Sequence, residues 1–181
     1  SSMKSFKSAF ILGSNSKVAK SICIKLAQAG CKKFHLVCRD LNQNQPLAEE
    51  LKLFYQAKVT QEQNDLLSNT SINDTFIPKI DIYDIYLIAS GSLGDASLAR
   101  ENATEALRIT SANYSGIIPW LTAITNDGRI KSPGSLWVFS SVAADRGRPS
   151  NYHYGAAKAA LSTFCEGLLL RCQGNPFSVR I

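Results

Sequence analysis

Short apolar runs recur along the chain, and each is followed by a stretch whose apolar residues are spaced as on a helix. The clearest runs, at 9–12, 34–38 and 85–89, are rich in Ile, Leu, Val and Phe, which is typical of buried strands. Weaker runs at 57–61, 136–140 and 177–181 complete six expected strands. Strands that alternate with helices predict an α/β fold, with a doubly wound parallel sheet covered by helices on both faces.

The stretches between the runs indicate the helices. Val18, Ile22 and Leu26 lie four residues apart before Gly30, which predicts a first helix that buries this face and ends at the glycine. Pro46 is expected to begin a second helix. Apolar spacing also predicts one continuous helix over 102–125 and another over 152–172.

No repeat or linker divides the sequence, so residues 1–181 are expected to form a single domain. The 181 residues with 45% hydrophobic content are enough for one core. Ser1 and Ser2, which precede Met3, are interpreted as a remnant of an expression vector.

Composition excludes several function classes. The net charge of +6 comes from dispersed Lys and Arg residues, so a nucleic-acid partner is not expected, whereas an anionic small ligand fits. The five cysteines form no CxxC pair, which favours reduced thiols without a disulfide or a bound metal. No apolar stretch approaches the roughly 20 residues of a membrane span. A soluble, cytoplasmic protein is expected.

The loop GSNSKVA, at 13–19, predicts a phosphate site. A glycine directly after a first strand allows a tight turn into a helix whose free N–H groups can face an anion. Small polar side chains could donate hydrogen bonds to phosphate oxygens, and a lysine would add positive charge. The residues expected to bind the phosphates are Gly13, Ser14, Asn15, Ser16, Lys17 and Val18. An ordinary strand-to-helix turn is the alternative, since two expected glycines are absent.

Arg39, directly after the second expected strand, predicts the choice of nucleotide. An acidic residue at this end of the strand would bind the adenosine ribose of NAD, whereas an arginine would pair with the 2′-phosphate of NADP. Cys38 occupies the place of the acid, and Asp40 comes one residue late and could simply cap the next helix. NADP is therefore expected in preference to NAD, with a plain surface arginine as the alternative.

Tyr154 and Lys158 are the strongest candidates for chemistry. They lie four apart at the start of an expected helix, so their side chains should be adjacent. A phenol beside an ammonium group is suited to proton exchange with a carbonyl or alcohol. Ser141, at the end of the fifth expected strand, could donate a hydrogen bond to the same oxygen. Purely structural roles for these residues are the alternative.

Together these motifs resemble the short-chain dehydrogenase/reductase family. The 13–19 loop is similar to its Gly-x-x-x-Gly-x-Gly motif, with Lys17 and Ala19 in place of two glycines. Ala89, Ser90 and Gly91 stand where the family has Asn-Ala-Gly. Asn113, Ser141, Tyr154 and Lys158 match its catalytic residues, and Asp65 matches an aspartate that meets the adenine.

The resemblance implies hydride transfer between a nicotinamide and a carbonyl carbon. Tyr154 would give a proton to the carbonyl oxygen, Ser141 would hold that oxygen, and Lys158 would assist the tyrosine and bind the nicotinamide ribose. Asn113 would hold a water that resupplies protons by way of Lys158. Cofactor contacts are also implied for Ala89, Ser90, Gly91 and Tyr154. The family often assembles as homodimers or homotetramers.

A narrower similarity is to reductases of lipid-linked sugars, such as the decaprenylphosphoryl-2-keto-ribose reductases, and it implies a substrate at a membrane surface. The family continues beyond the strand at 177–181 into a substrate-covering helix and a final strand, which this sequence is expected to lack. The departures from the family pattern keep a second hypothesis open, a non-catalytic NADP-binding or scaffold protein.

Overall fold

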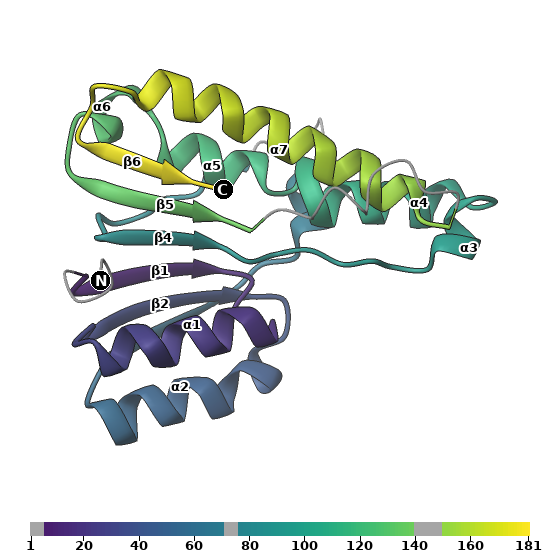
Figure 1. The fold of residues 1–181 in the computed structure, drawn as a ribbon. Coiled ribbons are helices and arrows are strands. Elements are labelled where there is room, and N and C mark those ends of the chain that lie inside the picture. Colours follow the sequence, from purple (N-terminus) through teal and green to yellow (C-terminus); the bar gives the residue numbers. More distant parts are fainter. Residues whose placement is uncertain (1–5, 71–75, 140–149) are drawn as a thin grey trace.

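Six parallel strands form the sheet of this protein, seen in the computed structural model, which describes residues 6–70, 76–139 and 150–181 (Figure 1). The strand order is β3-β2-β1-β4-β5-β6, and all neighbouring pairs run parallel. This confirms the predicted doubly wound sheet. The strands are β1 (Ser8–Leu12), β2 (Lys33–Cys38), β3 (Lys58–Gln63), β4 (Ile85–Ile88), β5 (Gly134–Val138) and β6 (Phe177–Arg180).

The central strands β1 and β4 separate two hydrophobic cores. Ile11 of β1 is in register with Leu36 of β2 and with Leu87 of β4, and these three side chains point into the core on one face of the sheet. Phe10, one residue earlier, points to the opposite face and packs against Trp120, with ring centroids 5.7 Å apart. Because both faces are covered, β1 from its second residue onward and the whole of β4 are buried, as is typical of parallel sheets.

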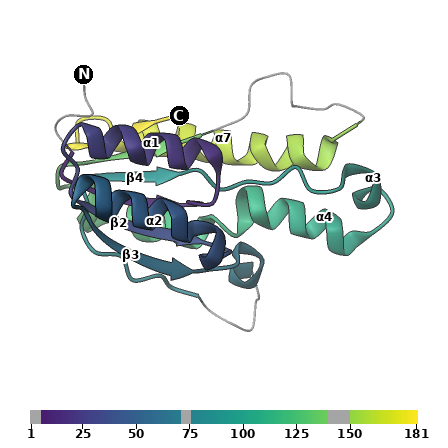
Figure 2. The same ribbon diagram turned by 90° about the horizontal axis from the view of Figure 1, so that it is seen from below.

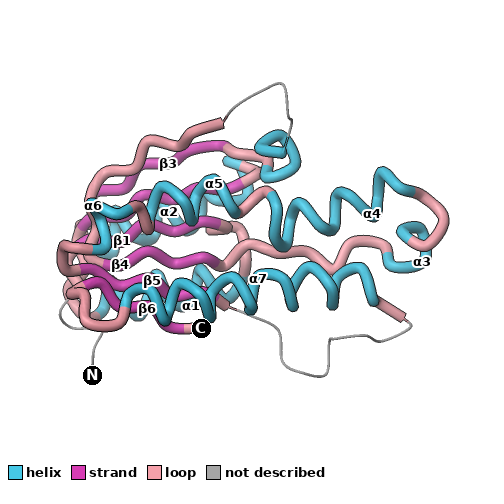
Figure 3. Tube along the Cα trace, turned by 90° about the horizontal axis from the view of Figure 1, so that it is seen from above, coloured by secondary structure: helices cyan, strands magenta, loops and turns pink. Residues whose placement is uncertain are grey.

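Helices cover both faces of this sheet. Helices α1 (Lys17–Gln28) and α2 (Leu41–Tyr55) lie on one face (Figure 2), whereas α5 (Ile118–Ile124) and α7 (Tyr152–Cys172) lie on the other (Figure 3). Two further helices, α3 (Ala96–Ala99) and α4 (Ala103–Thr110), extend with the start of α7 beyond the carboxyl ends of the strands. Two further short helices are α6 (Asp127–Ile130) and η2 (Leu66–Thr70).

The buried face of α1 differs from the predicted one. Ala19, Cys23 and Leu26 are fully buried, whereas Val18 is 51% exposed. Small side chains at the first two positions let the helix lie close to the sheet, and Val18 is rotated out of that contact. Leu26 was therefore predicted correctly, whereas the first two buried positions, Ala19 and Cys23, each lie one residue after the predicted Val18 and Ile22.

Helix α2 begins five residues before the predicted start. The Asp40 carboxylate accepts hydrogen bonds from the backbone N–H groups of Asn42 and Gln43, so the helix starts at Leu41 and contains Pro46 in its second turn. The expectation that Pro46 begins the helix was wrong. A strong N-cap outweighs the single backbone hydrogen bond that the proline removes.

The expected helix over 102–125 is interrupted. It consists of α4, a π-helical turn η3 (Ser111–Ser115) and α5. Gly116, directly after η3, packs so closely on η2 that an added Cβ atom would overlap the backbone oxygen of Leu66. The prediction of one straight helix was wrong because this tertiary contact and the wider π turn redirect the chain. The π turn also carries Asn113.

Candidate functional site

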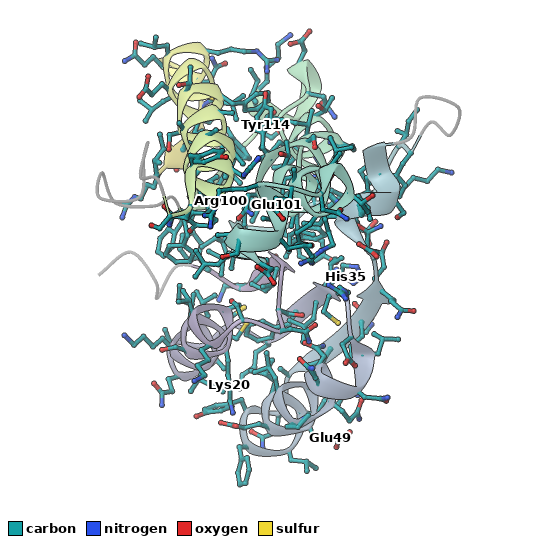
Figure 4. All side chains as sticks on the ribbon, turned by 90° about the vertical axis from the view of Figure 1, so that its right-hand side faces the viewer. Lys20, His35, Glu49, Arg100, Glu101 and Tyr114 are labelled. Atoms are coloured by element: carbon teal, nitrogen blue, oxygen red, sulfur yellow. The ribbon has the colours of Figure 1, made fainter. Side chains whose placement is uncertain are left out.

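A cavity of about 320 Å³ opens at the carboxyl ends of the central strands. The chain leaves neighbouring strands β1 and β4 toward opposite faces of the sheet, and doubly wound proteins bind ligands at such a switch point. Figure 4 looks onto this edge, with Lys20 on α1 below and Arg100 on the α3 side in front. The cavity is lined by Leu12, Gly13, Asn15, Ser16, Val37, Cys38, Arg39, Asn64, Asp65, Leu66, Leu67, Ala89, Ser90, Gly91, Ser92, Arg108 and Ala112.

Gly13 brings the loop after β1 close to the loop after β4. Its φ is +91°, and its N–H group donates to the Val37 oxygen at 2.8 Å. A Cβ atom at this position would lie 2.6 Å from the Ser90 nitrogen and 2.8 Å from the Ala89 carbonyl carbon. Only glycine fits both the dihedral angle and the space. The two loops therefore meet with no side chain of residue 13 between them.

The side chains of Ser14 and Asn15 form hydrogen bonds with other residues of the chain. The buried Ser14 hydroxyl donates to Asn44 Oδ1 at 2.7 Å. Asn15 Nδ2 donates to the Asp40 oxygen, and Asn15 Oδ1 accepts from the Asp40 N–H group, both at 3.0 Å. These bonds join the β1–α1 loop to the start of α2. Ser14 is absent from the cavity lining, whereas Asn15 contributes to it.

Ser16, Lys17 and Val18 form the start of α1. Ser16 lines the cavity and caps the helix, its Oγ accepting a hydrogen bond from the Ala19 N–H group at 3.0 Å. Lys17 and Val18 are exposed and do not belong to the cavity lining. The structure thus brings Gly13, Asn15 and Ser16 together at the cavity and places the other predicted loop residues beside it.

Cys38 and Arg39 line the cavity where β2 ends. Burial raises the pKa of the Cys38 thiol above its usual 9.0, so this side chain presents a neutral surface. Arg39 is exposed, and its guanidinium group pairs with no carboxylate among the described residues. Within the described part of the chain, the end of β2 therefore offers a positive charge that no ion pair balances.

Asn64 and Asp65, directly after β3, line the cavity beside the end of β2, where the Asn64 N–H group donates to the Cys38 oxygen at 2.9 Å. Asp65 Oδ1 accepts from the Leu67 N–H group at 3.0 Å, which caps η2. Asn64 exchanges two hydrogen bonds with Asn69 and accepts one from Trp120 Nε1 at 3.2 Å. Sequence reasoning proposed Asp65 and missed Asn64, whose role depends on contacts distant in the chain.

A second group of predicted residues converges beside Gly91. Asn113 is fully buried. Its Oδ1 accepts a hydrogen bond from the Ser92 N–H group at 3.1 Å, and its Nδ2 donates to the Ser92 oxygen at 2.7 Å. A Cβ atom on Gly91 would lie 2.8 Å from Asn113 Oδ1 and 3.3 Å from Lys158 Nζ. Lys158 is 7% exposed, and its Nζ donates to the Phe139 oxygen at 3.4 Å. The π turn, α7 and the loop after β4 thus meet at Gly91.

Of the other two candidate catalytic residues, the structure describes only Tyr154. Tyr154 lies one turn before Lys158 on α7, as the spacing of four requires, and is partly buried. Ser141 lies outside the described residues.

The sequence model of the short chain dehydrogenase family matches residues 7–181. The chain belongs to this family. An uncharacterised oxidoreductase of Mycobacterium tuberculosis is 43% identical over 82 residues, which are 45% of this chain and 33% of that protein. Another from Streptomyces coelicolor is 27% identical over 165 residues, 90% of this chain and 65% of that protein. The chain therefore spans between a third and two thirds of these relatives.

Solved structures of short-chain dehydrogenases share the fold. One from Sphingobium yanoikuyae, in complex with NADPH, superposes with a TM-score of 0.79 at 20% identity, covering 94% of this chain and 67% of that one. A bulky-bulky ketone specific alcohol dehydrogenase from Comamonas testosteroni gives 0.77 at 18% identity, covering 94% and 68%.

Two features are absent from the described residues of this short-chain dehydrogenase. None of its described helices combines the length and apolar character of a membrane span. The same residues contain no cluster of three His, Cys, Asp or Glu side chains that could bind a metal ion.

Sequence reasoning also missed an ion pair at the cavity rim. Glu105 is buried, and its carboxylate accepts hydrogen bonds from Arg108 Nε at 2.7 Å and from Arg108 Nη2 at 2.8 Å. It also accepts the Asp95 N–H group at 2.7 Å. These hydrogen bonds, led by those from Arg108, lower the pKa of Glu105 to about 2. The spacing of three on a helix could have indicated the pair, but not its place at the cavity.

Removing the Glu105 charge should therefore destabilise the protein in a pH-dependent way. The folded state holds the pKa of Glu105 near 2, below its usual 4.5. This contribution is complete above about pH 4.5 and is lost as the pH falls toward 2. We expect Glu105→Gln to lower the free energy of unfolding at pH 7, and this deficit to shrink below about pH 4.5. Urea unfolding at several pH values measures it.

Glu101→Gln is the control for that experiment, because Glu101 is exposed and forms no ion pair among the described residues. It should leave the free energy of unfolding nearly unchanged at each pH. A Glu105→Gln deficit that stays constant from pH 7 to pH 3 would contradict the account.

Proposed function

We propose that this chain is the dinucleotide-binding and catalytic part of an NADP(H)-dependent oxidoreductase that interconverts a carbonyl and an alcohol. The observation that carries the proposal is the continuity of the site. The cavity runs from Arg39 at the end of β2, which pairs with no carboxylate of the described residues, to Gly91 after β4, where Asn113 and Lys158 converge. One end can recognise a nucleotide, and the other offers groups that can exchange protons.

The described residues fit the cofactor. Gly13 lines the cavity and presents only backbone atoms there, so a ligand can approach this backbone closely. Asn15 and Ser16 line the cavity at the start of α1, where the helix dipole favours an anion such as the pyrophosphate. Arg39 would hold the 2′-phosphate of NADP, and Asp65 lies where the adenine would be received. When bound, the nicotinamide supplies or accepts the hydride.

The chemistry assigned to the chain's own residues is proton transfer and positioning. During reduction, the carbonyl carbon gains a hydride, and its oxygen gains a proton from the Tyr154 hydroxyl. Ser141 donates a hydrogen bond to that oxygen. Lys158, one turn from Tyr154, holds the positive charge that favours the phenolate left behind and binds the ribose. The phenolate then regains a proton from solvent.

Asn113 is given a positioning role in this proposal. Both its amide atoms bind the Ser92 backbone, and Nδ2 also donates to the Ile109 oxygen at 2.8 Å. The side chain therefore fixes the loop that carries Gly91 beside Lys158. The water assigned to Asn113 from the family resemblance would be held by the backbone of its π turn.

The substrate class and the assembly are parts of the same proposal. Similarity to reductases of lipid-linked keto-sugars and the net charge of +6 favour an anionic substrate at a membrane surface. Leu107 on α4 and Leu170 on α7 are 63% and 65% exposed, and burying such side chains between subunits would stabilise a homodimer or homotetramer. The cytoplasm is the proposed compartment.

Neutralising Arg39 tests the choice of cofactor. An arginine that binds the 2′-phosphate contributes a charge-assisted hydrogen bond, so we expect Arg39→Gln to weaken NADPH binding by about ten- to a hundredfold and NADH binding by less than about twofold. Nucleotide fluorescence titrations measure both dissociation constants. Lys20→Gln removes the same charge from an exposed position on α1 outside the cavity and should change neither. Equal losses for both nucleotides would contradict the 2′-phosphate assignment.

Removing the Tyr154 hydroxyl tests catalysis. General acid catalysis contributes about a hundred- to ten-thousandfold, so Tyr154→Phe should lower kcat/KM by that factor in NADPH oxidation with a panel of ketones and keto-sugars. The dissociation constant for NADPH should stay unchanged. Tyr152→Phe, a change at the exposed tyrosine two residues earlier, is the matched control. Full activity of Tyr154→Phe would refute the role, and a wild type that binds NADPH without turnover would favour the non-catalytic hypothesis.

A further inference from the structure

Arg108 enters the cavity from the side opposite α1. It lies four residues before Ala112, and both residues line the cavity, so α4 and the π turn present one continuous surface to it. The other lining residues near the end of β3 include Leu66 and Leu67. This end of the cavity therefore combines apolar side chains with a guanidinium group, which is planar.

The guanidinium group is held in a fixed orientation. Two of its nitrogens donate to the two carboxylate oxygens of Glu105, at 2.7 and 2.8 Å. Glu105 is buried and is itself held by the Asp95 N–H group and, through its own N–H group, by Asn102 Oδ1. The Arg108 side chain remains 34% exposed. One edge of the plane is thus occupied by Glu105, and the partly exposed side chain contributes to the cavity lining.

The surrounding charges distinguish Arg108 from Arg39. The charge of Arg108 is balanced by the bidentate Glu105 carboxylate, and Asp65 adds a second attractive carboxylate nearby. A cation that is already neutralised is a weak phosphate ligand, but its planar face can still stack on an aromatic ring. Arg39 pairs with no described carboxylate, so its guanidinium group is available to form an ion pair with a phosphate.

We propose that Arg108 recognises the adenine ring of the nucleotide by stacking, with Glu105 as the residue that positions it. This rests on the proposed function, since it assumes that a dinucleotide occupies the cavity. The two arginines divide the recognition: Arg39 binds the phosphate at the end of β2, and Arg108 covers the base beside Leu66 and Leu67.

The test is calorimetric titration with NADPH and with ADP, which carries the adenine without the nicotinamide. Arg108→Met should weaken both by about five- to tenfold, as expected for loss of a stacked cation. Arg108→Lys should not restore binding, because lysine keeps the charge but lacks the plane. Arg100→Met is the control, since Arg100 is exposed and outside the cavity lining. If Arg108→Met unfolds because Glu105 is left unpaired, the variant carrying both Glu105→Gln and Arg108→Met replaces it.

The outcomes separate the two proposals. If the wild type binds both nucleotides and Arg108→Met binds them with the same affinity, the stacking role is refuted and the proposed function stands. Full restoration by Arg108→Lys also refutes stacking, because charge alone would then suffice. A wild type that binds neither nucleotide overturns both proposals. The loss in Arg108→Met should also be nearly the same at about 50 mM and about 300 mM salt, since stacking is screened far less than a charge contact.

Discussion

The site depends on the close approach of two loops, one after β1 and one after β4. A Cβ atom on Gly13 would lie 2.6 Å from the Ser90 nitrogen, so the two loops can meet only because residue 13 has no side chain. The contact places the end of β1, and with it the start of α1, beside the loop that carries Gly91. Everything proposed for the cavity follows from this geometry, because it makes one continuous site from elements on opposite sides of the switch point.

Polar side chains hold the rest of the site around that contact. Asn15 fixes the start of α2 through the backbone of Asp40, and Asn113 fixes the β4 loop through the backbone of Ser92. Both use a side-chain amide to satisfy one backbone donor and one backbone acceptor, which leaves few unpaired polar groups at an irregular edge. The 13–19 loop has small polar residues and lacks two of the family's glycines. Its small polar side chains therefore help to hold the site in place.

Much of the fold could be predicted from sequence, because its central strands are short apolar runs whose pattern reflects burial on both faces. Local sequence patterns failed to predict the structure where contacts between residues distant in the chain determine it. The π turn at Asn113 and the packing of Gly116 on Leu66 interrupt a segment whose apolar spacing alone predicts one helix. For the candidate site, Gly13 and Arg39 could be found because each directly follows a strand. Asn64 and Arg108 could not, because only the folded chain brings them to the cavity.

The most direct test of the central claim is a map of backbone amide chemical shifts during titration of the chain with NADPH. A nucleotide bound at the switch point should move the signals of residues 13–16, 37–39, 64–67 and 89–92, which come from four separate loops, together with Arg108 and Ala112. Signals on the far halves of α1 and α2 should stay in place. Shifts confined to one loop, shifts elsewhere, or no change at saturating NADPH would contradict the account.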